Sequence, residues 1–145
     1  MGNFEEEIKS KFESEHQKAF LNIKYTNNYF SHIADEIFVN SNISSQQYNV
    51  LRILRGAKKA IKVSVVKNRM IEKSPNTTRL MDKLVNKELI VRSRKEEDRR
   101  AVYVEITKKG LDLVGSINVN DARLSLTNIT TEEAIELNRI LDKIR

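Results

Sequence analysis

The sequence predicts a mainly α-helical protein with one small β-hairpin, which is an α+β fold class. Over most of the chain, apolar residues recur every three or four positions, as they do on the buried face of a helix. Only in residues 89–106 do apolar and β-branched residues form the short runs that are typical of paired strands. The chain has 145 residues with one proline and four glycines, a length and composition that suit one ordered domain over residues 1–145.

Residues 74–87 carry the signals of a helix start followed by an amphipathic helix. Ser74 has a side-chain oxygen that can accept from the free N–H groups at a helix start, and Pro75 suits the first helical position. Leu80, Met81 and Leu84 share one face, which we expect to point inward. The other faces are polar and cationic, and they carry Asn76, Thr78, Arg79, Lys83 and Lys87.

A charged turn, residues 94–100, connects the two predicted strands. Five of its side chains are candidates for contact with a polyanion or for holding the turn: Arg94, Lys95, Asp98, Arg99 and Arg100. A basic helix followed by such a hairpin is the layout of a winged helix-turn-helix. In that fold the helix lies in the major groove of DNA, and the hairpin, or wing, reaches the phosphates or the minor groove. We therefore predict a winged helix-turn-helix lobe over residues 44–110.

The charge distribution supports this division of the chain. The net charge is +6 overall, but residues 44–110 carry +11, whereas residues 1–43 carry −3 and residues 111–145 carry −2. The basic block predicts a lobe that binds a polyanion. The two mildly acidic chain ends should have a different function, most simply dimerisation. The plainer alternative, a solvated basic face, does not explain why the charge coincides with the helix and the hairpin.

We expect the chain ends, residues 1–40 and 111–145, to form the dimerisation helices. Phe4 and Ile8 indicate a short first helix, and a longer helix should run from about Ser14 to Phe38. At the other end, Thr130 and Glu133 match a capping box that begins the last helix. Its apolar stripe comprises Ala134, Leu137, Ile140 or Leu141, and Ile144.

The elements of the central lobe are bounded by further caps. A helix over residues 46–55 should be capped by Ser44 or Ser45 and ended by Gly56. A short strand is predicted at residues 60–63, and Ser64 can cap a helix that ends at Met70 or Ile71. Thr107 can cap a helix that continues to about Leu126, although Gly115, Asn118 and Asn120 lower its helix propensity.

Four segments in order resemble motifs of the MarR family of bacterial transcription regulators. They are QYNVLRILRG at residues 47–56, Ser74-Pro75 with TRL at 78–80, DRRA at 98–101 and ITKKG at 106–110. The chain departs from the family pattern at Lys62, where Ser or Thr is usual, near Val65, where an acidic residue is usual, and at Thr77, where an apolar residue is usual.

The resemblance implies a homodimeric DNA-binding regulator, a ligand-responsive repressor that binds a near-palindromic operator. It implies that Asp98 helps to hold the wing while an arginine, Arg99 or Arg100, enters the minor groove. It also implies a small phenolic or anionic effector, for which the candidate pocket residues are Tyr25, Tyr29, Tyr48 and Arg52.

Several other functions lack their sequence signals. The chain has no cysteine, so disulfides and thiolate metal sites are excluded, and His16 and His32 stand too far apart to indicate a metal site. No phosphate-binding glycine loop or nucleophile elbow is present, so we expect neither an enzyme nor a cofactor. The longest uncharged run is too short to span a bilayer, and the acidic start does not look like a signal peptide, which predicts a cytoplasmic protein.

Two functional classes remain after these exclusions. One is the DNA-binding regulator, and the other is a winged-helix interaction module that binds an acidic protein partner or RNA. Asn76, Thr78 and Arg79 are residue types that can form hydrogen bonds with base edges, whereas a protein-binding helix more often presents apolar anchors. The outward face of the predicted helix therefore favours double-stranded DNA.

Overall fold

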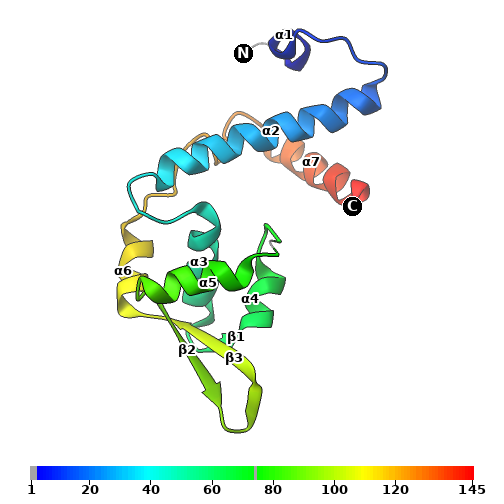
Figure 1. The fold of residues 1–145 in the computed structure, drawn as a ribbon. Helices are drawn as coiled ribbons and strands as arrows, with labels where there is room; N and C mark the ends of the chain where they lie inside the picture. Colours follow the sequence, from blue (N-terminus) through cyan, green and yellow to red (C-terminus); the bar gives the residue numbers. More distant parts are fainter. Residues whose placement is uncertain (1–2, 74) are drawn as a thin grey trace. The chain divides into compact units, whose positions relative to one another are not determined.

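A computed structural model describes residues 3–73 and 75–145 of the chain (Figure 1). The contacts divide it into two compact units. One comprises the residues up to Ile33 together with Val119–Arg145, and the other is Ala34–Asn118. The second unit contains the predicted winged helix-turn-helix lobe and the cationic side chains that belong to it.

The elements follow one another as helices interrupted by a small sheet, which confirms the predicted α+β class. The helices before the sheet's hairpin are α1 (Phe4–Ile8), α2 (Glu15–Phe38), α3 (Ser45–Ala57), α4 (Val63–Arg69) and α5 (Thr77–Asn86). The strands are β1 (Ile61–Lys62), β2 (Ile90–Lys95) and β3 (Asp98–Ile106). The hairpin is followed by α6 (Lys108–Ser116) and α7 (Thr131–Ile144).

The second unit is built on an antiparallel sheet with the strand order β1-β3-β2. The central strand, β3, pairs with β1 at Ile61↔Val104 and with β2 at Ile90↔Ile106. Its residue Val104 is fully buried. Helices α3, α4, α5 and α6 surround a core of fully buried side chains: Val50, Leu51, Leu54, Val66, Met81, Leu84, Ile90, Val104 and Val114. Figure 1 shows the β2–β3 hairpin extending beyond the helices as a wing.

The predicted helix caps that rest on local chemistry are present. Ser44 forms a capping box with Gln47 at the start of α3, and Thr130 forms one with Glu133 at the start of α7. The hydroxyl of Thr107 accepts from the Gly110 amide at 3.0 Å. Helix α2 ends at Phe38, as the periodicity predicts. The three caps at Ser44, Thr107 and Thr130 depend on hydrogen bonds between residues three positions apart, which a sequence displays directly.

The predicted start of the recognition helix at Ser74 and Pro75 is wrong. Helix α5 begins at Thr77 with Asn76 as its N-cap, Pro75 lies in the preceding turn, and Ser74 lies outside the described residues. The later start places Thr77, Met81 and Leu84 on one buried face at helical spacing. Thr77 occupies the inner position that the sequence pattern assigns to an apolar residue.

Three other boundaries differ from the prediction. Helix α3 continues through Gly56 and ends at Ala57, and its C-cap Lys58 adopts the left-handed conformation with φ 54°. Helix α4 begins at Val63 with Lys62 as its N-cap and without a side-chain cap bond, so Ser64 does not cap it. Helix α6 ends at Ser116 and does not reach Leu126, because Ile117 is extended.

The wing is more regular than the predicted turn of residues 94–100. The strands reach Lys95 and Asp98, which face each other, and a register shift occurs between Ser93 and Lys95. Only Glu96 and Glu97 remain between the strands. The cations that were expected at the tip therefore lie on the flanking strands, and the tip itself is acidic.

Candidate nucleic-acid interface

Helix α5 presents the polar face that the sequence predicts. Asn76, Thr78, Arg79 and Lys83 are all exposed, while Met81 and Leu84 on the opposite side are fully buried. The strong separation of polar and apolar residues follows from the three- and four-residue spacing of the buried positions. The exposed side chains therefore stand on a rigid helix whose inner face is fixed in the core.

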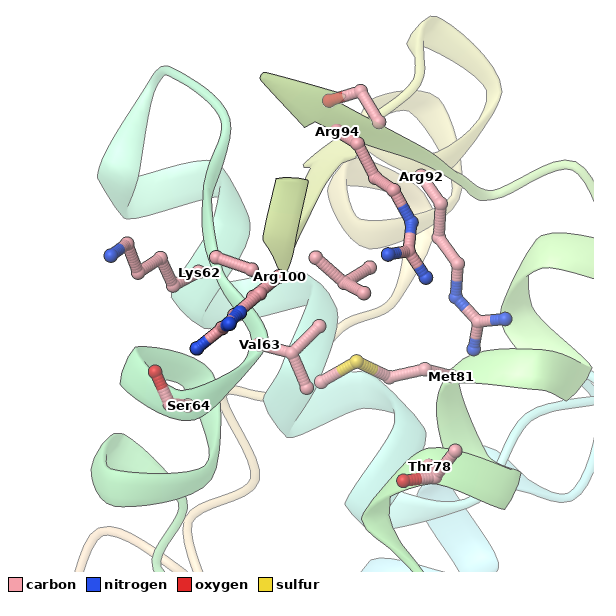
Figure 2. Close-up of a pocket in the computed structure, with 11 residues that line it drawn as sticks. Lys62, Val63, Ser64, Thr78, Met81, Arg92, Arg94 and Arg100 are labelled. Atoms are coloured by element: carbon pink, nitrogen blue, oxygen red, sulfur yellow. The ribbon is translucent and has the colours of Figure 1, made fainter. Parts of the chain in front are cut away.

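A groove of about 650 Å³ lies between α5, the start of α4 and the wing. Four cationic side chains line it: Lys62, Arg92, Arg94 and Arg100. Figure 2 shows Arg92 and Arg94 on one side of the groove, Lys62 and Arg100 on the other, and Val63 and Met81 between them. The groove thus joins the recognition helix and the wing into one basic surface.

The wing aspartate is held by a lysine from outside the wing. Lys62 Nζ lies 2.9 Å from Asp98 Oδ2, and both side chains are about two-fifths exposed. The hydrogen bond with Lys62, followed by the backbone amides of Ala101 and Arg100, lowers the pKa of the Asp98 carboxyl, and the same pair raises the pKa of Lys62. Both groups are therefore ionised at neutral pH.

The arginines of the wing have different partners. Arg94 Nη1 donates to the backbone oxygen of Arg99 at 2.7 Å, which ties β2 to β3 near the tip. The Lys95 ammonium lies 4.6 Å from the ring centroid of Tyr103. Within the part of the chain that the structure describes, no carboxylate pairs with Arg99 or Arg100. Both arginine side chains are exposed on the wing.

A second ion pair connects the wing to the recognition helix. Arg92 Nη2 on β2 lies 2.5 Å from Asp82 Oδ1 on α5. Sequence reasoning missed Lys62 as the partner of Asp98, and it missed both Arg92 and Asp82. In each case the partners come from different elements, so only the three-dimensional structure brings them together.

The four candidate effector residues are divided between the two units. Tyr25 and Tyr29 belong to the first unit, where a hydrogen bond with Glu7 raises the pKa of the Tyr25 hydroxyl and Tyr29 packs against Phe30. Tyr48 and Arg52 belong to the second, where Tyr48 is buried against Phe38 at a centroid distance of 4.9 Å. Arg52 donates to Asn49 at 3.1 Å. The pocket stays a prediction.

Two kinds of site are not found in the described parts of the chain. In residues 3–73 and 75–145 no cluster of three histidine, aspartate or glutamate side chains could hold a metal ion. In the same residues no helix is both long enough and apolar enough to cross a membrane.

Comparison with known proteins identifies the family. The sequence model described as "Transcriptional regulator SarA/Rot" matches residues 29–117, which include α3, the hairpin and α6. The chain belongs to the SarA/Rot family of MarR-like transcriptional regulators. The HTH-type transcriptional regulator MgrA of Staphylococcus aureus is 27% identical over 122 residues, which cover 83% of this chain and 80% of MgrA. PecS of Dickeya dadantii is 27% identical over 115 residues, or 76% of this chain and 69% of PecS.

Solved structures agree with this assignment. A MarR transcription factor from Planctomyces limnophilus is 32% identical with a TM-score of 0.67, covering 91% of this chain and 98% of that one. A mutant MarR from E. coli, solved in complex with operator DNA, is 25% identical with a TM-score of 0.77, covering 93% and 99%. The resemblance to the MarR family and the winged-helix fold are thereby confirmed.

These findings decide between the two functional classes. The relatives are helix-turn-helix transcription regulators, and this SarA/Rot-family chain is a DNA-binding transcription regulator. The basic surface formed by α5, the groove and the wing is accordingly the candidate DNA interface.

Proposed function

We propose that this SarA/Rot-family chain is a repressor that binds a near-palindromic operator as a homodimer. Helix α5 lies in the major groove, and the wing, residues 94–100, lies at the minor groove. The observation that carries this proposal is the exposure of the α5 side chains Thr78, Arg79 and Lys83 and of the N-cap Asn76, next to a groove lined by four cations. Amide, hydroxyl and guanidinium groups read base edges, and a basic groove attracts the phosphate backbone.

The dimer is supported by apolar side chains that are exposed in the single chain. On α7, Leu137 is 42% exposed, Ile140 is 42% exposed and Ile144 is 63% exposed. A helix with an apolar stripe in water gains from burial against a second surface. A two-fold dimer carries two α5 helices, one for each half of a near-palindrome.

The wing roles follow from the charges on the hairpin. Lys95, Arg99 and Arg100 surround an acidic tip, and an arginine is the side chain best suited to a narrow minor groove. Arg99 and Arg100 are both candidates for that position.

A small phenolic or anionic effector bound near Tyr25, Tyr29, Tyr48 and Arg52 is also part of the proposal, as is a cytoplasmic location.

Selection of bound sequences from a random duplex pool tests the proposal. We expect a near-palindromic consensus, and a slope of log K against log salt of about −5 to −9 if a dimer neutralises roughly six to ten phosphates. An unrelated duplex of equal length is the control for sequence preference. Binding that does not depend on salt, or that prefers no duplex sequence, would support the interaction module that binds an acidic protein or RNA.

A further inference from the structure

The outer part of the wing is paired less regularly than the rest of the hairpin. Beyond Ser93 the β2–β3 register shifts, and Lys95↔Asp98 is the last pair before the tip. Arg94 binds the backbone of Arg99, but both residues belong to the wing itself. These bonds keep the two strands together, yet they do not determine where the end of the wing points relative to the helices.

The Arg92–Asp82 pair joins the base of the hairpin to α5, and Lys62 adds a connection nearer the tip. Lys62 is the last residue of β1, where it pairs with Tyr103 of β3, and it is also the N-cap of α4. Its side chain reaches Asp98, 36 positions along the chain, and lies 5.9 Å from the ring centroid of Tyr103. In residues 3–73 and 75–145, the bond from Lys62 to Asp98 is the side-chain hydrogen bond that joins residues 94–100 to β1 and the start of α4.

We propose that Lys62 is a positioning residue that holds the wing through Asp98 and thereby sets how well the protein discriminates the sequences that flank the operator core. This DNA readout rests on the proposed function, whereas the positioning itself is a property of the free protein. The alternative is that Lys62 acts as one more phosphate contact. Lys62 and Arg100 line the same groove, and Asp98, the partner of Lys62, begins the strand that carries Arg99 and Arg100.

The charges of the two partners separate these explanations. Lys62→Met removes a positive charge and should weaken binding to every duplex, whereas Asp98→Asn removes a negative charge and should strengthen it. The asparagine oxygen still accepts from the amides that the Asp98 carboxyl meets. If Lys62 positions the wing, both variants should nevertheless lose discrimination between A·T-rich and G·C-rich flanks, by at least about threefold.

The variants needed for the test include a conservative change and a matched control. Lys62→Arg preserves the ion pair and should retain the flank discrimination of the wild type. Combining Lys62→Met with Asp98→Asn should lose no more discrimination than either single variant, because both remove the same pair. Lys108→Met is the control, since Lys108 pairs with Asp112 at the same 2.9 Å but on α6, and it should leave the flank discrimination unchanged.

A measurement on the DNA-free protein completes the experiment. In Lys62→Met, the pKa of the Asp98 carboxyl, followed by NMR, should rise toward its ordinary value, and the amides of residues 95–100 should exchange faster. Because the wild-type pKa is lowered, the pair should be intact above the ordinary carboxyl range and should be lost as pH falls through the lowered pKa. Urea unfolding midpoints show whether each variant remains folded.

The outcomes distinguish failure of this inference from failure of the proposed function. If the wild-type protein binds its operator but Lys62→Met and Asp98→Asn keep full flank discrimination, the positioning role is wrong. The same conclusion follows if Lys62→Met weakens all duplexes equally and Asp98→Asn only strengthens them, since Lys62 is then a phosphate contact. If the wild-type protein shows no sequence preference while the wing amides of Lys62→Met exchange faster, the proposed function fails and the positioning stands.

Discussion

Arg92 and Asp82 join the wing to the recognition helix through an ion pair of 2.5 Å between Nη2 and Oδ1. Asp82 is half exposed and lies on α5 one turn after Arg79, so it places a negative charge on the surface that we assign to DNA. Arg92 neutralises that charge and contacts the side of the helix. The pair therefore has two consequences for DNA binding, one electrostatic and one geometric.

Asp82→Asn should separate these consequences. It removes one negative charge per protomer and releases Arg92, so we expect affinity for an unrelated duplex to rise by roughly threefold or more at low salt. Because the helix loses a lateral contact, the ratio of operator affinity to non-specific affinity should fall. Fluorescence anisotropy with both duplexes measures this ratio. Asp112→Asn on α6 is the control, and an unchanged non-specific affinity in Asp82→Asn would contradict the argument.

The acidic tip of the wing leads to a second prediction. Glu96 and Glu97 form the two-residue turn between β2 and β3, next to cations that we place at the minor groove. Their charges repel phosphates, so the double variant Glu96→Gln, Glu97→Gln should bind all duplexes more tightly, and the gain should shrink as salt rises. Glu105→Gln, on β3 and away from the tip, is the control. Weaker binding by the double variant would show that the glutamates make favourable contacts.

Much of the fold can be predicted because its signals are local. The caps at Ser44, Thr107 and Thr130 each depend on a side chain and an amide three residues later, and the change from helical to β-branched patterning locates the hairpin. The exposed face of α5 follows from the spacing of its buried residues. These features need no knowledge of how distant segments meet.

The parts that could not be predicted depend on tertiary contacts. Asp98 has two adjacent arginines in the sequence, but its partner is Lys62, which the pairing of β1 with β3 brings close. Gly56 matches the glycine that often follows a helix, yet α3 continues through it and the left-handed residue is Lys58. The local glycine signal therefore does not locate the end of this helix. The capping signal at Ser74 and Pro75 is local, whereas the observed start of α5 at Thr77 places Thr77, Met81 and Leu84 on one buried face.

The two glycines of α6 predict opposite effects on stability. A Cβ at Gly110 would lie 2.3 Å from the Leu89 backbone oxygen and 2.7 Å from Ile106 Cγ1, whereas a Cβ at Gly115 would meet nothing within 4 Å. Gly110→Ala should therefore lower the free energy of unfolding by about 1–3 kcal/mol through overpacking. Gly115→Ala should raise it by about 0.5–1 kcal/mol through helix propensity. Urea unfolding measures both, and a stabilising Gly110→Ala would contradict the close packing.

The dimer should depend on one face of α7. Leu137 belongs to the predicted stripe, whereas Ile135 is 64% exposed and lies on the other side of the helix. Leu137→Gln should weaken the dimer by about 1.5–3 kcal/mol for each copy of the residue that is buried. Ile135→Gln is the matched control and should leave the dimer intact. Light scattering over a concentration series measures both, and equal effects of the two variants would assign the interface to another surface.

The base-reading role of α5 can be tested at Arg79, which is exposed at the start of the helix. If its guanidinium binds a guanine edge, Arg79→Ala should cost about 1–3 kcal/mol on the operator and relax the preference at one position per half-site. Lys83→Ala, a cation removed from the same helix face, should instead weaken all sequences alike and reduce the salt slope. A panel of operators with single substitutions separates the two patterns.

The same panel identifies the wing contact. Alanine at whichever of Arg99 and Arg100 enters the minor groove should weaken binding most where the flanks are A·T-rich, because narrow grooves attract guanidinium groups, and it should leave the core preference unchanged. Equal losses from Arg79→Ala on every sequence would show that Arg79 holds a phosphate. Base reading would then pass to Asn76 and Thr78, whose amide and hydroxyl groups are exposed on the first turn of the same helix.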